Sequence, residues 1–160
     1  MQNLKHLLEK LINHNVDFVL VGGFAGVVHG TSMVTQDLDI CAAITMSNLS
    51  SLRLALEKLN PRHRMNPHFK PSFLEIPKNL EEMKNIYLET DLGVLDIMSS
   101  LPPIGDFELI KSRSISIDLY GKKCCVISLE DLIAIKEVMK RPKDLQAVQE
   151  LKLIQEKLKK

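Results

Sequence analysis

The sequence predicts an α+β fold in which helices flank a mixed β-sheet. Two observations indicate this class: helical and strand patterns alternate in roughly the first third of the chain, and two hairpin patterns with further helical segments follow. Such an order is typical of an α+β domain with a mixed sheet. The length of 160 residues suits one domain with one core. We therefore expect residues 1–160 to form a single domain.

In the first part of the chain, leucines at helical spacing predict an amphipathic helix over residues 2–14, with Asn15 as its C-cap. A short β-branched run over 16–21 predicts a buried strand. The next expected elements are a helix over 23–29 that Gly30 ends, a strand over 37–42, and a helix over 48–59 that Ser47 caps.

Residues 61–85 contain four prolines and a basic triplet, Arg62-His63-Arg64, and are expected to form a loop or insertion with one short strand at 73–76. The remaining chain predicts two hairpins, a short helix between them and a C-terminal helical pair within 129–158. The expected ranges are strands 86–89 and 94–98, a helix over 104–111, strands 115–119 and 124–127, a helix from Ser128 to about Lys140, and a helix over 143–158.

Composition excludes several classes of protein. The net charge of +1 implies no general attraction to nucleic acid or to a membrane surface, although a local basic groove would remain compatible with tRNA. No apolar run reaches membrane-spanning length, so no membrane partner is expected. The odd number of cysteines argues against a disulfide framework and for a cytoplasmic protein, with Cys41 packed as a small hydrophobe.

The candidate site lies between residues 19 and 40. There a buried strand runs into the turn glycines Gly22 and Gly23, which would let backbone N–H groups approach a phosphate. Asp37 and Asp39 follow two residues apart on a strand, so their side chains share one face and repel each other unless a cation lies between them.

Asp96 lies among apolar strand residues in Val94-Leu-Asp96-Ile-Met98, where an unpaired carboxylate would be costly. If its strand lies beside the Asp37–Asp39 strand, three carboxylates converge. Three oxygen ligands suit Mg²⁺, and two such ions would activate an attacking hydroxyl and stabilise a leaving pyrophosphate.

Two commoner nucleotide-binding motifs are excluded. The glycines do not form G-x-G-x-x-G, and Asp37 is too close to them to be the acidic residue of a dinucleotide-binding fold. The chain also lacks the G-K-[ST] of a P-loop at this position.

The combined pattern of apolar strand, Gly-Gly, short helix, Asp-x-Asp and a later lone Asp resembles the DNA polymerase β-type nucleotidyltransferases. It is closer to the small AbiEii-like toxin enzymes, whose motif reads approximately G-G-x-A-x-x-x-x-G-x-x-R-x-T-x-D-h-D, with h apolar. The matching residues are Gly22, Gly23, Ala25, Gly30, Thr35, Asp37 and Asp39. The segments Leu129–Lys136 and Arg141–Asp144 also look like that family's closing segment.

The resemblance implies a nucleotidyltransferase-like sheet and a role for each matching residue. Asp37, Asp39 and Asp96 would be catalytic and would bind two Mg²⁺ or Mn²⁺ ions. Gly22, Gly23 and Thr35 would lie at the triphosphate. Lys136 would either contact phosphate or belong to a solvated helix face, and Arg141 and Asp144 would either pair at a helix corner or shape the pocket.

Met33 departs from the family, which has arginine there. The glycines and the three aspartates favour a metal-dependent transfer of NMP from an NTP to a hydroxyl. Met33 favours the alternative, a catalytically silent nucleotide- or protein-binding domain. The acceptor could be tRNA, protein or a small molecule such as an antibiotic, and an antitoxin is the protein partner that the toxin branch implies.

Overall fold

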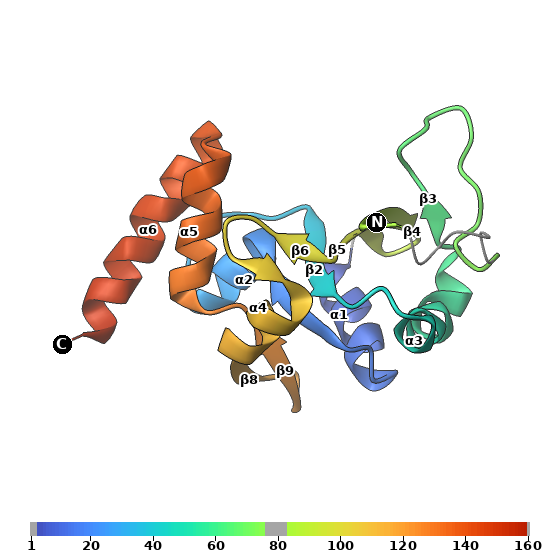
Figure 1. The fold of residues 1–160 in the computed structure, drawn as a ribbon, viewed down its shortest axis with the longest axis horizontal. Coiled ribbons are helices and arrows are strands. Elements are labelled where there is room, and N and C mark those ends of the chain that lie inside the picture. Colours follow the sequence, from blue (N-terminus) through green and yellow to red (C-terminus); the bar gives the residue numbers. More distant parts are fainter. Residues whose placement is uncertain (1–2, 76–82, 160) are drawn as a thin grey trace.

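The computed structural model describes residues 3–75 and 83–159. Within these ranges the chain forms a seven-stranded mixed sheet in the order β3-β4-β5-β2-β1-β9-β8, with six α-helices around it (Figure 1). The α+β class predicted from the sequence is therefore confirmed.

The six α-helices and the longer strands follow the predicted order, whereas the two-residue strands β3, β6 and β7 were not predicted. The helices are α1 (Leu4–Asn13), α2 (Gly22–His29), α3 (Met46–Leu56), α4 (Phe107–Arg113), α5 (Leu129–Met139) and α6 (Pro142–Leu158), with a 3₁₀ turn over Glu57–Leu59. The strands of the main sheet are β1 (Phe18–Val21), β2 (Asp37–Ala42), β3 (Arg62–His63), β4 (Asn85–Thr90), β5 (Gly93–Met98), β8 (Ile115–Leu119) and β9 (Lys122–Val126). A separate two-stranded ribbon pairs β6 (Ser100–Leu101) with β7 (Gly105–Asp106).

Three predicted helix ends were wrong, each because another residue caps the helix. Helix α1 ends at Asn13 with His14 as its C-cap. Helix α3 begins earlier than predicted because the Thr45 hydroxyl, not Ser47, accepts the hydrogen bond from the N–H of Asn48. Helix α4 begins later because Asp106 caps it through the N–H of Leu109.

The strand predicted at 73–76 was also wrong. Residues 73–75 form a turn, and Ile76 lies outside the described residues. The short strand of this segment is instead β3, which pairs with β4 at the edge of the sheet. The edge of β3 that faces away from β4 has a local hydrogen-bond partner, because the N–H of His63 donates to the carbonyl of Pro71.

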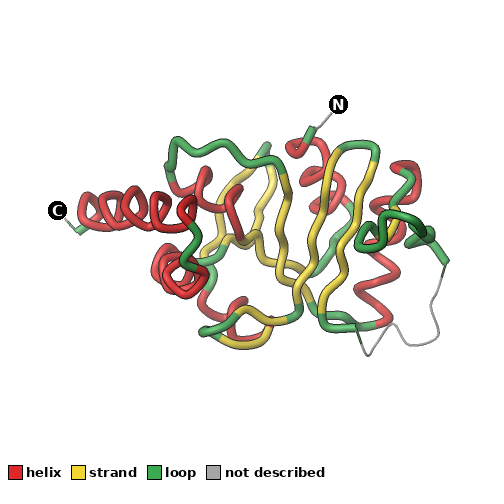
Figure 2. The backbone as a smooth tube through the Cα atoms, turned by 90° about the horizontal axis from the view of Figure 1, so that it is seen from above, coloured by secondary structure: helices red, strands yellow, loops and turns green. Residues whose placement is uncertain are grey.

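The central strand β2 determines the position of the candidate site. It lies antiparallel to β1 and parallel to β5, and β9 continues the sheet parallel to β1. The strands of the sheet lie side by side in the middle of the molecule (Figure 2). On β2 the side chains of Leu38 and Ile40 are fully buried, whereas Asp37 and Asp39 on the opposite face are partly exposed. The alternating pattern therefore presents the carboxylates away from this part of the core, as the sequence predicted.

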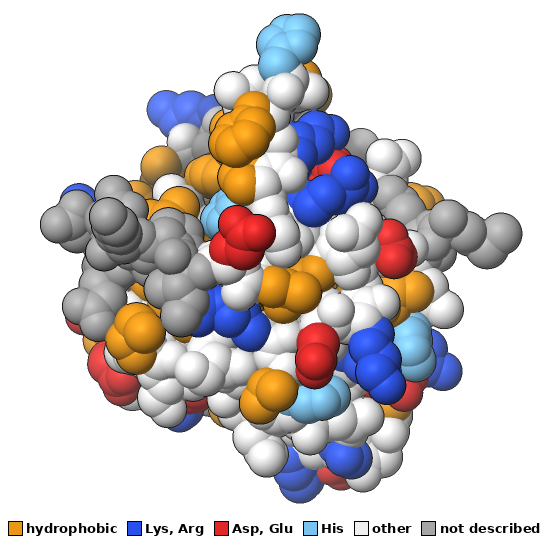
Figure 3. Space-filling view, turned by 90° about the vertical axis from the view of Figure 1, so that its right-hand side faces the viewer, with side chains coloured by type: hydrophobic (Ala, Val, Ile, Leu, Met, Phe, Trp, Pro, Cys, Tyr) orange, Lys and Arg blue, Asp and Glu red, His pale blue; other side chains and the backbone are white. Residues whose placement is uncertain are grey.

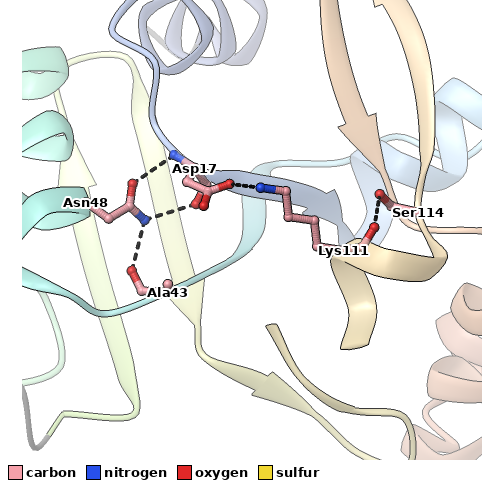
Figure 4. A network of polar contacts seen from close by, with 5 residues as sticks. All are labelled: Asp17, Ala43, Asn48, Lys111 and Ser114. Carbon is pink, nitrogen blue, oxygen red and sulfur yellow. Dashed lines mark hydrogen bonds and ion pairs between the residues drawn. The ribbon is translucent and has the colours of Figure 1, made fainter. Parts of the chain in front are cut away.

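The core joins the sheet to helices α1 and α3, which pack against each other. A buried amide ties α3 to the sheet: the side chain of Asn48 accepts from the N–H of Asp17, just before β1, and donates to the carbonyls of Asp17 and of Ala43, just after β2 (Figure 4). The Asp17 carboxylate also pairs with Lys111 of α4 at 2.7 Å. Cys41 is fully buried, as expected for a small hydrophobe.

The C-terminal helices α5 and α6 pack against each other and against α2, and extend beyond the strands at one end of the molecule (Figures 1 and 2). Ser128 caps α5 by accepting from the N–H of Asp131, as predicted. No helix among the described residues combines the length and the apolar character needed to cross a membrane.

Candidate active site

A row of residues across the sheet contains two of the three predicted carboxylates. Asp39 on β2 lies directly opposite Asp96 on the parallel strand β5, and Asp96 in turn lies opposite Tyr87 on β4. Residues in register on neighbouring strands project to the same face. Asp37 shares this face because it stands two positions before Asp39. The sheet thus places on one face the three carboxylates that the sequence selected.

Gly22 begins helix α2 immediately beside Asp39. Its φ of +69° lies in the left-handed region, which favours glycine. A Cβ at this position would collide with the Asp39 carboxylate, since even the Asp39 Cβ would be only 2.8 Å away. Gly22 therefore allows the backbone N–H groups at the start of α2 to lie next to the carboxylates.

Gly23 and Thr35 form a second close contact at this turn. A Cβ on Gly23 would stand 3.1 Å from the Thr35 hydroxyl oxygen, so the small residue keeps the two segments together. The Thr35 hydroxyl donates to the carbonyl of Asp37 at 2.9 Å. Thr35 thus positions the start of β2 and leaves only its remaining lone pairs for a ligand.

The electrostatics of Asp39 indicate excess negative charge. Burial, and after it the neighbouring charges of Asp96 and Asp37, raise the pKa of Asp39 to about 6, against the opposing effect of Lys136. A cation among these carboxylates would remove that repulsion.

Asp96 is 8% exposed and already has a cationic partner. The Arg64 Nη2 atom lies 2.7 Å from both carboxylate oxygens, and Arg64 Nε lies 3.3 Å from one of them. Burial keeps the pKa of Asp96 above its usual value although Arg64 acts in the opposite direction. The third carboxylate is therefore neutralised from the β3 side of the sheet.

The residues present fit a divalent cation in their chemistry, since carboxylates gathered on one face are the hard oxygen ligands that Mg²⁺ prefers. Their present arrangement is not a complete ligand set: over residues 3–75 and 83–159, no three His, Cys, Asp or Glu side chains are grouped closely enough to hold an ion. In addition, Arg64 engages both oxygens of Asp96.

A cavity of about 360 Å³ opens beside these residues. It brings together six of the seven predicted site residues: Gly22, Gly23, Thr35, Asp37, Asp39 and Lys136. Asp96 is not among the lining residues and lies next to the cavity through its pairing with Asp39. The size lies within the range of small-molecule sites.

Lys136 is a cavity residue and not part of a solvated helix face. It is 9% exposed, and its Nζ atom lies 3.7 Å from the Asp144 carboxylate. Burial lowers the pKa of Lys136, although Asp144 favours its charged form. Both expectations for Arg141 are met, since its Nε lies 2.6 Å from the fully buried Asp144 carboxylate and its side chain lines the cavity.

The loop over 31–36 forms another wall of the cavity. It contains Met33 at the position where arginine was expected, together with Val34 and Gln36. The loop is tied to α6, because the N–H and hydroxyl of Ser32 donate to the Glu150 carboxylate at 2.9 and 3.0 Å. His29 contacts the carbonyl of Ile127 through its ring nitrogen at 2.8 Å.

Sequence reasoning missed two cations at this site. Lys143 of α6 lines the cavity and acts on the charge of Asp39, but nothing in its local sequence distinguished it from a surface lysine. Arg64 stood in the basic triplet 62–64 within a segment read as a loop. No local signal could have identified it, because only the pairing of this segment with β4 places Arg64 opposite Tyr87 and so in line with Asp96.

Comparison with known proteins places this geometry in context. A family model described as "Nucleotidyltransferase of unknown function" (DUF6036) matches residues 1–157. No curated protein sequence matches the chain.

Solved structures share the fold at low identity. A Thermotoga maritima protein provisionally named a nucleotidyltransferase has a TM-score of 0.50 at 16% identity, over 99% of this chain and 96% of its own. The antibiotic-resistance factor ANT(2″)-Ia has a TM-score of 0.58 at 14% identity, over 97% and 84%. The Megavirus polyadenylate synthase has a TM-score of 0.54 at 11% identity, over 92% of this chain and 30% of its own.

Proposed function

The chain belongs to this family of nucleotidyltransferases, and we propose that it is a divalent-metal-dependent enzyme that transfers NMP from an NTP to a hydroxyl acceptor. The observation that carries the proposal is the pairing of Asp39 with Asp96 beside the Gly22 turn and the cavity. A nucleotide in the cavity would have carboxylates at one end and the helix start beside them.

In the proposed reaction, the acceptor oxygen forms a bond to the α-phosphorus, and the bond from that phosphorus to the bridging oxygen of the β-phosphate breaks. Pyrophosphate leaves with the electron pair of the broken bond, and the hydroxyl proton passes to Asp96. The start of α2, with Lys136 and Lys143 from the opposite wall, would hold the triphosphate. These roles are supported by position and charge.

Asp37, Asp39 and Asp96 would hold the divalent cations. When bound, Mg²⁺ or Mn²⁺ would lower the charge of the phosphates and make the acceptor hydroxyl easier to deprotonate. The raised pKa of Asp39 supports this assignment, since it reflects burial and carboxylate repulsion that a cation would offset.

The acceptor remains part of the proposal. ANT(2″)-Ia is described in complex with adenylyl-2″-tobramycin, which makes a small-molecule hydroxyl one candidate for this chain. tRNA and protein hydroxyls are the others. On the face in view in Figure 3, at the end of the molecule that carries β3, basic, acidic and hydrophobic side chains are intermixed and form no continuous basic patch. This face gives no preference to a polynucleotide.

A toxin role with an antitoxin partner is the finer assignment that the AbiEii-like motif suggests. Expression of the chain in a bacterial host tests it: growth arrest that depends on Asp39 would support a toxin, and normal growth with active enzyme would contradict it.

A catalytically silent nucleotide-binding domain is the second candidate. Two observations favour it: Met33 lines the cavity at the position where the AbiEii-like motif has arginine, and Arg64 occupies Asp96. The experiment that separates the candidates incubates the protein with labelled NTPs, Mg²⁺ and acceptors of the three classes.

Transfer that Asp37→Ala and Asp39→Ala abolish, and that the exposed control Asp118→Ala on β8 retains, would support the enzyme. Transfer that survives both changes would contradict the mechanism. Metal-dependent NTP binding without transfer to any acceptor would support the silent domain.

A further inference from the structure

Arg64 reaches Asp96 across an intervening strand. Its backbone N–H donates to the carbonyl of Tyr87 at 3.1 Å, which continues the β3–β4 pairing by one residue. Tyr87 lies opposite Asp96, and Asp96 lies opposite Asp39. Arg64 therefore stands at the β3 end of the same row that holds the carboxylates.

The side chain spans this row over the Tyr87 ring. The Arg64 guanidinium carbon lies 5.6 Å from the ring centroid, and Nη2 lies 2.7 Å from both oxygens of Asp96. The ion pair is largely enclosed, with the Arg64 side chain 28% exposed and that of Asp96 12% exposed. A guanidinium does not lose its proton in proteins, so this cation is permanent.

The carboxylates are consequently unequal as ligands. Both oxygens of Asp96 already accept hydrogen bonds from Arg64. Asp37 and Asp39 line the cavity, and no hydrogen bond or ion pair joins either carboxylate to a cationic side chain in the part of the chain that the structure describes. A divalent cation that binds Asp96 must displace or share those oxygens with Arg64, whereas one that binds Asp37 and Asp39 need not.

We propose that Arg64 is a positioning residue that reserves Asp96, so that a first divalent cation binds through Asp37 and Asp39 and a second binds at Asp96 in competition with the guanidinium. This inference rests on the proposed function. It gives the site an order of assembly: the second cation completes the catalytic set only after Arg64 has moved off Asp96.

Binding of Mn²⁺ alone to the full chain, followed by electron paramagnetic resonance and calorimetry without nucleotide, tests the order. We expect two affinities in the wild type, the weaker belonging to Asp96. Arg64→Gln should strengthen the weaker affinity by about tenfold, a typical size for coupling between two competing ligands. Arg64→Lys keeps the positive charge but loses the two-pronged guanidinium, so its weaker Mn²⁺ affinity should fall between those of the wild type and Arg64→Gln.

Lys70→Gln is the matched control, because Lys70 pairs with Glu89 on β4 near the same edge and should leave both affinities unchanged. Equal weaker-site affinities in the wild type, Arg64→Gln and Arg64→Lys would overturn the inference while leaving the proposed function intact. Should Arg64→Gln fail to fold, the wild type and Arg64→Lys alone decide the comparison. Absence of Mn²⁺ binding in all of them would instead contradict the metal-dependent function itself.

Discussion

Asp39 and Asp96 occupy directly opposed positions on the parallel strands β2 and β5. Like charges at such positions oppose sheet formation, because neither side chain can turn away to the other face. This energetically unfavourable pair lies beside the turn at Gly22, where the absence of a Cβ leaves space for the Asp39 carboxylate. We interpret the pair as a site selected for function at the expense of stability.

Removing the Asp39 charge should stabilise the fold at neutral pH. The folded-state pKa is raised to about 6 from 3.8, so the contribution of this carboxyl to stability is fully present below 3.8 and is lost as pH rises through about 6. Asp39→Asn should therefore raise the free energy of unfolding above pH 6 by up to about 3 kcal/mol, given about 1.4 kcal/mol per pKa unit.

Denaturant titrations from pH 4 to pH 8 measure this difference. The gain should shrink steadily towards pH 4, and the exposed Asp118→Asn should show little change at any pH. A variant as stable as the wild type at pH 8 would refute the interpretation of Asp39 as a destabilising charge.

Gly22→Ala should lower the free energy of unfolding by more than the same substitution does at an ordinary glycine in the left-handed region. Gly121 in the β8–β9 turn has a φ of +83° with no atom within 4 Å of an added Cβ, so Gly121→Ala carries the backbone strain alone, about 1–2 kcal/mol. Gly22→Ala adds the collision with Asp39 and should lose a further 1–3 kcal/mol, roughly the usual cost of overpacking. Thermal unfolding of both variants compares them, and equal losses would show that the Asp39 contact is unimportant.

Met33→Arg should strengthen NTP binding. Met33 lines the cavity near the carboxylates, where an added guanidinium could reach the phosphates. We expect Kd for the metal–NTP complex to fall by about tenfold, equal to about 1.4 kcal/mol. Val138→Arg places the same charge on an exposed position of α5 outside the cavity and should have no effect. Unchanged or weaker binding by Met33→Arg would mean that this wall does not face phosphate.

Lys136→Met should raise KM for the NTP with a smaller effect on kcat, since under the proposed function it removes a buried cation that would bind the phosphates equally in the ground state and the transition state. The change should be about tenfold. Asp144 keeps its pairing with Arg141, so the fold should survive. Lys152→Met removes an exposed α6 lysine paired with Glu137 and serves as the control. A KM equal to that of the wild type would assign Lys136 to structure alone.

Much of the fold was accessible from sequence because its signals are local. The alternation of Leu38 and Ile40 with two aspartates fixes the faces of β2, and the Gly30 stop fixes the end of α2. The carboxylates were expected to converge if the strand of Asp96 lay beside the strand of Asp39, and the structure confirms that these two strands pair. It could be anticipated because an apolar strand tolerates a carboxylate poorly without a special environment.

The remainder depends on contacts between distant segments. Thr45 and Ser47 both suit an N-cap, and only the packing of α3 decides between them. Arg64 directly follows β3, a strand of two residues, which is too short to show periodicity. Whether that arginine turns to Asp96 or to solvent is decided by the order β3-β4-β5, which no local pattern encodes.

The bond between Ser32 and Glu150 joins residues 118 positions apart and makes the cavity wall dependent on the last helix. A chain shortened before Glu150 would keep Asp37, Asp39 and Asp96, yet the segment carrying Met33 would lose its hydrogen bonds to α6. Partial proteolysis or C-terminal fusion should therefore affect nucleotide affinity through the mobility of this wall, at a distance from the reacting groups. Helix α6 would in that way influence how tightly the cavity holds a nucleotide.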